Sequence, residues 1–173
     1  HAEVYGDEGF TKNEIYRNQQ IDIAFYLKQE ELDPFIEKDK TRIQTGFKYY
    51  TQADDEFDED SILYDSEAAI AQAKEDARIF YNSKLDKLSK AQDLMGGKDA
   101  CLVCALPAEI LGQSWHEGIY WLENLIRISC EEGKLSLVTC QDLIKDQFSL
   151  PKVELYPCSS NGLGYGEDLL DNS

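Results

Sequence analysis

The sequence predicts a mainly helical fold built around one long central helix, with a few short strands allowed in the C-terminal half (an α+β variant). The first observation is segment 66–95, in which the strong helix formers Ala, Lys, Glu, Gln and Leu dominate. The second is that its apolar residues recur at the spacing of one helix face. Asp65 or Ser66 can cap its start, and Gly96 and Gly97 follow its end. At roughly 28–30 residues, this helix is long enough to support the other elements.

Two further helices are predicted in the first fifty residues. Thr11 and Glu14 form a capping-box pattern, which predicts a helix from there to about Glu31. Asp33 and Pro34 have the residue types of an N-cap and a first helical position, so a second helix is expected to begin there. The apolar positions expected on one face of this second helix are Ile36, Ile43, Phe47 and Tyr50.

The second half predicts shorter elements. Residues 101–106 form an apolar run that fits a buried strand or the start of a helix. Ser114 and Glu117 form another capping-box pattern before a helix that ends at Gly133. Residues 134–139 and 152–157 are compatible with short strands, and a short helix capped by Thr139 is expected between them. We expect one domain over residues 1–157 and a loosely ordered, acidic Gly/Ser tail over residues 158–173.

The charge balance limits the classes of function. The 173 residues contain 34 Asp and Glu against 17 Lys and Arg, a formal net charge of −17. Such a chain repels nucleic acid and anionic membranes and attracts basic protein surfaces, so direct nucleic-acid or membrane binding is not expected. An odd count of five Cys, no signal-peptide pattern and no apolar run near the roughly 20 residues that span a bilayer favour a cytoplasmic protein. No cofactor is predicted.

The stretch "ADDEFDED" at residues 53–60 is the most acidic part of the chain. It fails as a calcium loop because Glu59 stands where the loop needs Gly. Two interpretations remain: a solvated connector between two helices, or an acidic face that imitates a row of phosphates and covers a basic, nucleic-acid-handling surface of a partner protein. The residues of this candidate acidic face are Asp54, Asp55, Glu56, Asp58, Glu59, Asp60, Glu30 and Glu31. The favoured function is therefore a non-enzymatic, protein-binding inhibitor or regulator, of the type that phages and mobile elements use.

Two other functions stay open. Cys101 and Cys104 have the spacing of half a zinc knuckle, which makes a metal-binding or redox protein the alternative. The second pair is missing, and the apolar residues around these thiols fit two buried core cysteines better. An enzyme with carboxylates around His116, the one internal imidazole, is the third possibility. The phosphate-loop, dinucleotide, zinc-protease and serine-hydrolase motifs are absent from the sequence.

Overall fold

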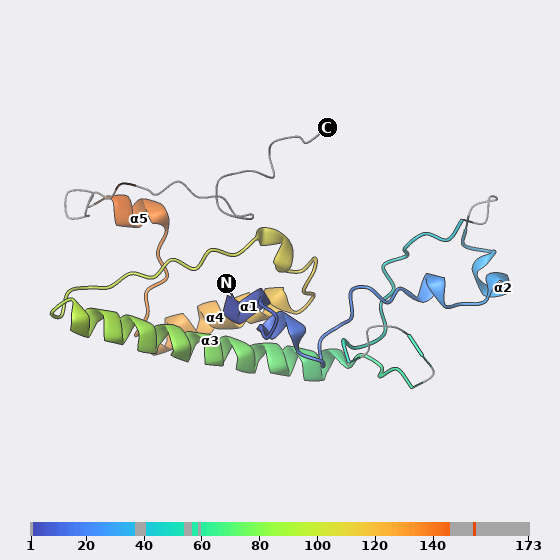
Figure 1. Ribbon diagram of the computed structural model, residues 1–173, viewed down its shortest axis with the longest axis horizontal. Coiled ribbons are helices and arrows are strands. Elements are labelled where there is room, and N and C mark those ends of the chain that lie inside the picture. Colours follow the sequence, from blue (N-terminus) through green and yellow to red (C-terminus); the bar gives the residue numbers. More distant parts are fainter. Residues whose placement is uncertain (1, 37–40, 54–56, 59, 146–153, 155–173) are drawn as a thin grey trace. The chain divides into compact units, whose positions relative to one another are not determined.

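A computed structural model describes residues 2–36, 41–53, 57–58, 60–145 and 154, and it confirms the mainly helical fold (Figure 1). The chain divides into two compact units, His1–Leu137 and Val138–Ser173. The helical elements are α1 (Ala2–Tyr5), η1 (Phe10–Lys12), η2 (Ile23–Phe25), α2 (Gln29–Leu32), α3 (Ser66–Leu94), η3 (Ala108–Ile110), α4 (Gly118–Glu132) and α5 (Cys140–Ile144). In the described part of the chain, β structure is limited to isolated bridges. No helix there is long and apolar enough to cross a membrane.

The predicted central helix is confirmed as α3. The Asp65 side chain accepts hydrogen bonds from the backbone N–H groups of Glu67 and Ala68, so it satisfies two of the donors that a helix start leaves free. One face of α3 consists of small side chains that are fully buried, and this allows α4 to approach closely. Phe80 of α3 meets Trp121 of α4 edge to face, with 5.0 Å between ring centroids. The small residues on this face are Ala69, Ala73 and Ala77.

The helix predicted after residue 114 is confirmed as α4, but its first turn differs. The Ser114 hydroxyl bonds the Glu109 carbonyl, and the Glu117 side chain turns into the protein, so neither completes the predicted capping box. The helix therefore begins at Gly118. It ends as predicted at Gly133, whose φ of +62° suits a residue without a Cβ.

The helix predicted over residues 11–31 is wrong. Three side chains in this segment bond backbone N–H groups two or three residues further along, and these local bonds compete with helical ones. Asn13 accepts from Ile15, and Asn18 accepts from Gln20 and Ile21. Only the short elements η1, η2 and α2 remain. The acceptors that redirect the chain are Asn13, Asn18 and Asp22.

The helix predicted from Pro34 to Tyr50 is also wrong over the part that the structure describes, because residues 41–49 have no helix. The cause is the fully buried Asp22 carboxylate. Its oxygens accept from the backbone N–H groups of Thr45 and Gly46 at 2.9 and 2.8 Å and from the Thr45 hydroxyl at 2.7 Å. The Lys48 ammonium lies 3.7 Å away. One carboxylate thus fixes a second segment in an extended path.

The predicted strands are not found where the structure can be described. Residues 101–106 are extended but lie outside any sheet, and residues 134–138 are irregular. The helix after Thr139 is confirmed as α5, with reciprocal capping bonds between Thr139 and Asp142. Apart from Glu154, the strand expected at 152–157 lies outside the described residues, as does the boundary expected before the tail.

We expect Asp22→Asn to lower the free energy of unfolding by about 3 kcal/mol at neutral pH, because an amide NH2 group then faces donors that the carboxylate accepted. Burial raises the pKa of Asp22, but hydrogen bonds from Thr45, Ala24 and Gly46 and the charge of Lys48 lower it below its ordinary value overall. Because the pKa of Asp22 is lower in the folded than in the unfolded protein, its ionised carboxylate stabilises the fold at pH values above the unfolded pKa of about 3.8. This stabilisation is lost as the pH falls through the folded-state pKa.

Urea denaturation at neutral pH and at a pH below 3.8 measures both effects. The difference between wild type and variant should shrink at the lower pH. Asp93→Asn, at an exposed position near the end of α3, is the matched control and should change stability by less than about 0.5 kcal/mol. Equal stability of Asp22→Asn and wild type at neutral pH would contradict the role assigned to Asp22.

Candidate functional site

A buried group of interacting side chains lies between α3 and the turn before α4. We call it the buried carboxylate cluster, made of Tyr16, Tyr64, Asp76, Trp115 and Glu117. Tyr16 comes from the loop after η1, Asp76 from the middle of α3, and Glu117 from the residue before α4. Both carboxylates are buried, with Asp76 3% exposed and Glu117 fully covered. The cluster therefore joins three segments that are far apart in the sequence.

Asp76 has two side-chain donors. The Tyr16 hydroxyl donates to Oδ2 at 2.5 Å, and the Gln72 amide donates to Oδ1 at 2.8 Å. Burial raises the pKa of Asp76 above its ordinary value, although these two hydrogen bonds partly oppose the increase. Burial and the Asp76 carboxylate together raise the pKa of Tyr16. The tyrosine is thus held as a neutral donor.

Glu117 holds the other side of the cluster. Its Oε1 accepts from the backbone N–H of Arg17 at 3.2 Å. Burial and the nearby Glu117 carboxylate raise the pKa of Tyr64. Burial and the positive charge of Arg17 lower the pKa of His116, so its imidazole is neutral near pH 7. His116 is half-buried and meets the Tyr64 ring edge to face at 6.3 Å.

Aromatic rings enclose the cluster. Trp115 packs against Tyr16 at 5.5 Å between centroids and against Trp121 at 5.7 Å. A carboxylate that acts on a substrate must be reachable, whereas Asp76 and Glu117 are covered by these rings and by their own partners. The arrangement therefore positions three segments and does not present a pair of catalytic carboxylates.

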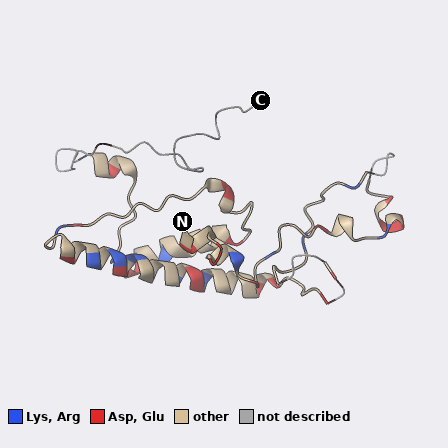
Figure 2. Cartoon of the chain, in the orientation of Figure 1, with Lys and Arg blue, Asp and Glu red and all other residues tan. Residues whose placement is uncertain are grey.

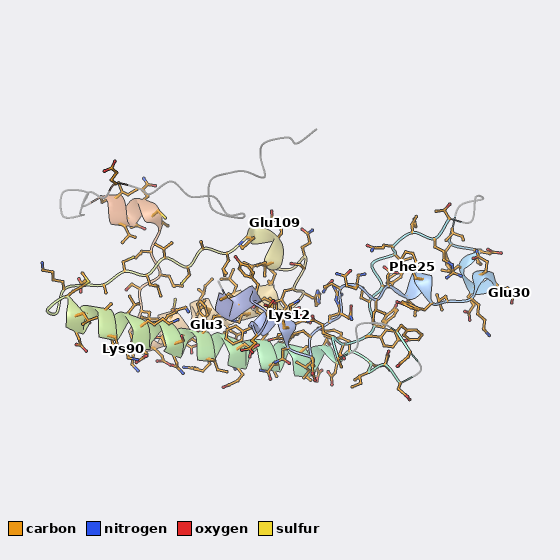
Figure 3. All side chains as sticks on the ribbon, in the orientation of Figure 1. Glu3, Lys12, Phe25, Glu30, Lys90 and Glu109 are labelled. Carbon is orange, nitrogen blue, oxygen red and sulfur yellow. The ribbon has the colours of Figure 1, made fainter. Side chains whose placement is uncertain are left out.

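A cavity of about 250 Å³ lies elsewhere, between α1, α3 and the segment around Cys104. Its charged groups interact with one another, because Glu3 pairs with Lys84 and lies 3.3 Å from Lys87. Burial raises the pKa of Glu3, but hydrogen bonds from these lysines and from Ser83 lower it to about 2. Glu3, on α1, is labelled in Figure 3. These three side chains leave a net charge of +1, and both ammonium groups lie against the same Glu3 carboxylate.

The candidate acidic face is only partly described. Glu30 and Glu31 are exposed on α2, and Glu31 is engaged in capping that helix through the backbone of Lys28. Asp58 and Asp60 are exposed on a separate loop, where Asp58 bonds the Ser61 hydroxyl and the Asp60 backbone. Figure 2 shows acidic and basic residues interspersed along α3. The remaining members, Asp54, Asp55, Glu56 and Glu59, lie outside the described residues, so the acidic face stays a prediction.

Cys101 and Cys104 are exposed free thiols on the extended segment after α3, so the expectation that they are buried in the core is wrong. In the part of the chain that the structure describes, no strand pairs with residues 101–106 and covers the two thiols. Among the described residues, no group of three or more His, Cys, Asp or Glu side chains is placed to hold a metal ion.

Sequence reasoning did not identify the buried carboxylate cluster, although one signal was available. Asp76 lies three residues after Ala73 and directly before Ala77, so it occupies the apolar face of the helix that was otherwise predicted correctly. A charged residue on such a face indicates a buried partner. Nothing local in the sequence indicates that the partner is Tyr16, 60 residues earlier.

Comparison with known proteins shows what the fold resembles. No protein-family model matches the sequence. The chain is similar to the α-amylase AmyC from Thermotoga maritima, with 28% identity, a TM-score of 0.72, and coverage of 84% of this chain and 28% of that one. A GH57-type branching enzyme from Pyrococcus horikoshii matches with 20% identity, a TM-score of 0.72, and coverage of 95% and 27%. A GH57 branching enzyme from Thermococcus kodakaraensis matches with 18% identity, a TM-score of 0.65, and coverage of 87% and 24%.

These matches overturn the expected function. The fold is that of a segment of carbohydrate-active enzymes, and the expectation of a non-enzymatic, acidic inhibitor that mimics nucleic acid is wrong. That expectation relied on net charge, which governs solubility and long-range attraction but does not determine fold. The chain spans about a quarter of the length of the enzymes it matches, at 28%, 27% and 24%.

Two substitutions at Asp76 separate its hydrogen bonds from its charge. Asp76→Ala leaves the buried Tyr16 hydroxyl without its acceptor and should cost about 2–3 kcal/mol of stability. Asp76→Asn keeps an acceptor oxygen and removes the buried charge, so it should cost much less.

The pH dependence gives the second readout. Because the folded-state pKa of Asp76 is raised, wild type loses stability as pH rises from the unfolded value of about 3.8 through the folded value. Asp76→Asn lacks this loss, so its stability relative to wild type should improve between pH 4 and pH 7, as measured by urea denaturation. An alanine variant as stable as wild type would contradict the assigned role.

Proposed function

We propose that this chain is the helical part of an enzyme that acts on α-glucan, similar to the GH57 enzymes that it matches. The observation that carries the proposal is the match to the Thermotoga maritima α-amylase, in which 28% identity and a TM-score of 0.72 coincide over 84% of the chain. The matching branching enzymes, at lower identity, have the same fold.

The chemistry of glycoside cleavage limits what this part of the enzyme does. Such enzymes commonly place two carboxyl groups on either side of the scissile bond, with space for the sugar and for water. Asp76 and Glu117 are buried among aromatic rings and are engaged in hydrogen bonds within the protein. We therefore assign this pair to positioning and not to bond cleavage. The chain contributes a helical framework and the loops that the framework holds.

The acidity of the chain is compatible with this substrate. An α-glucan is uncharged, so a formal charge of −17 neither attracts nor repels it at long range. Its recognition depends on hydrogen bonds and on contacts with its apolar faces, and salt screens neither strongly. The affinity for glucan should consequently be nearly independent of ionic strength.

Isothermal titration of the chain with maltoheptaose, an α-linked glucose oligomer, tests the proposal. We expect saturable binding that changes little between low and high salt, and much weaker binding of cellohexaose, a β-linked glucose oligomer of similar length. Absence of maltoheptaose binding would overturn the proposed function.

Incubation with amylose then distinguishes the two possible reactions. Hydrolysis consumes one water and releases one reducing end for each bond cleaved. Branching moves a glucan segment to a new position, so the number of reducing ends stays constant while iodine staining falls. Binding remains the deciding measurement, because the chain spans about a quarter of its matching enzymes.

A further inference from the structure

Two aromatic side chains stand exposed on the extended segment that Asp22 holds in place. Phe47 is 58% exposed and Tyr49 is 50% exposed. Their ring planes are parallel to within 9°, and their centroids are 6.2 Å apart. We call these two residues the aromatic pair. Large rings usually lie in a core or an interface, so two parallel exposed rings need an explanation other than folding.

The two rings lie on the same face because side chains along this extended segment alternate between two faces, as in a β-strand. Lys48, between the two rings, is turned inward and lies 3.7 Å from the buried Asp22 carboxylate. Tyr50 is also turned to the inner side, where its ring packs against Phe57 at 4.9 Å. Successive side chains of an extended segment point to opposite faces, so positions 47 and 49 share the outer face. The inner face is occupied by protein, whereas the two rings on the outer face are exposed to solvent.

The backbone beneath the pair is fixed by hydrogen bonds. The Phe47 carbonyl accepts from Ile23 at 3.1 Å, and the Tyr49 carbonyl accepts from Tyr64 at 2.8 Å. The Tyr50 carbonyl accepts from Asn18 at 2.9 Å. Since the segment is held from both sides, ligand binding would not need to order it, and a preorganised surface of this kind binds with a smaller loss of entropy.

The charges around the pair favour an uncharged ligand. Lys48 is engaged by Asp22. Arg42, the other cation of the segment, donates to the carbonyl oxygens of Ala24 and Leu27 at 2.8 and 2.9 Å. Neither of these two cations is directed at the two rings, so an anionic ligand would find no counter-charge within residues 41–50, the described part of this segment. A pyranose ring, by contrast, has a flat face of C–H groups that packs on an aromatic face.

We infer that Phe47 and Tyr49 form a stacking site for consecutive glucose units of an α-glucan chain. The inference rests on the proposed function, because the matching enzymes supply the class of sugar. It adds a specific surface, outside the buried carboxylate cluster, at which the chain would hold its substrate.

The test compares maltoheptaose binding by four forms of the chain. Phe47→Ala/Tyr49→Ala should weaken the affinity by about tenfold or more, since it removes both flat faces. Phe47→Leu/Tyr49→Leu keeps apolar bulk and should still lose affinity, because a flat ring is what the sugar requires. Phe35→Ala is the matched control, as Phe35 is 83% exposed but belongs to a different segment, and it should bind like wild type.

The outcomes separate this inference from the proposed function. If wild type binds maltoheptaose and both double variants bind it equally well, the stacking site is wrong and the proposed function stands. If wild type binds no maltoheptaose, both fail. Equal affinity for cellohexaose would overturn the α-glucan assignment in favour of unspecific aromatic contact. Urea denaturation measures the stability of both double variants. If Phe47→Ala/Tyr49→Ala is unstable, Phe47→Leu/Tyr49→Leu still tests the stacking site.

Discussion

The hydrogen bond from Tyr16 to Asp76 is the interaction on which the remainder of the first unit depends. It attaches an irregular N-terminal segment to the middle of the 29-residue helix α3. The Tyr16 ring then supports Trp115, and Trp115 contacts Trp121, so the same tyrosine links α3 to the turn before α4. Burying the Asp76 carboxylate in this core costs free energy, and the hydrogen bonds from Tyr16 and Gln72 offset part of that cost.

This core contact and the exposed aromatic pair are connected through a short stretch of backbone. The Tyr16 carbonyl accepts from the backbone N–H of Gln52, and the next residue, Arg17, forms an isolated bridge with Thr51. The backbone N–H of Asn18 donates to the Tyr50 carbonyl. Asp22, five residues after Arg17, then fixes the segment that contains Phe47 and Tyr49 by accepting from the backbone of Thr45 and Gly46. The segment that positions the exposed rings is therefore anchored at Tyr16, which donates to Asp76 of α3, and at Asp22, whose own carboxylate holds Thr45 and Gly46.

The sequence predicted the elements whose causes are local. The cap at Asp65, the helix formers of α3, the glycine after α4 and the capping box at Thr139 all act within a few residues, and each of these helices is confirmed. The first fifty residues could not be predicted in this way, because Asp22 bonds Thr45 and Gly46, more than 20 residues away. Periodicity treated Phe47 and Tyr50 as one helix face, whereas they lie on opposite sides of an extended segment.

The acidic composition had an ambiguity that only structure could resolve. A carboxylate counts equally toward net charge whether it is exposed, as Glu30 is, or buried as an acceptor, as Asp22, Asp76 and Glu117 are. The buried ones do not present a binding face to any partner; they order loops and orient aromatic rings. Net charge alone therefore pointed to a basic partner, whereas the proposed stacking site takes an uncharged ligand. For a sugar-binding surface the informative residues are the exposed aromatics and the constraints that hold them, and charge counts contain neither.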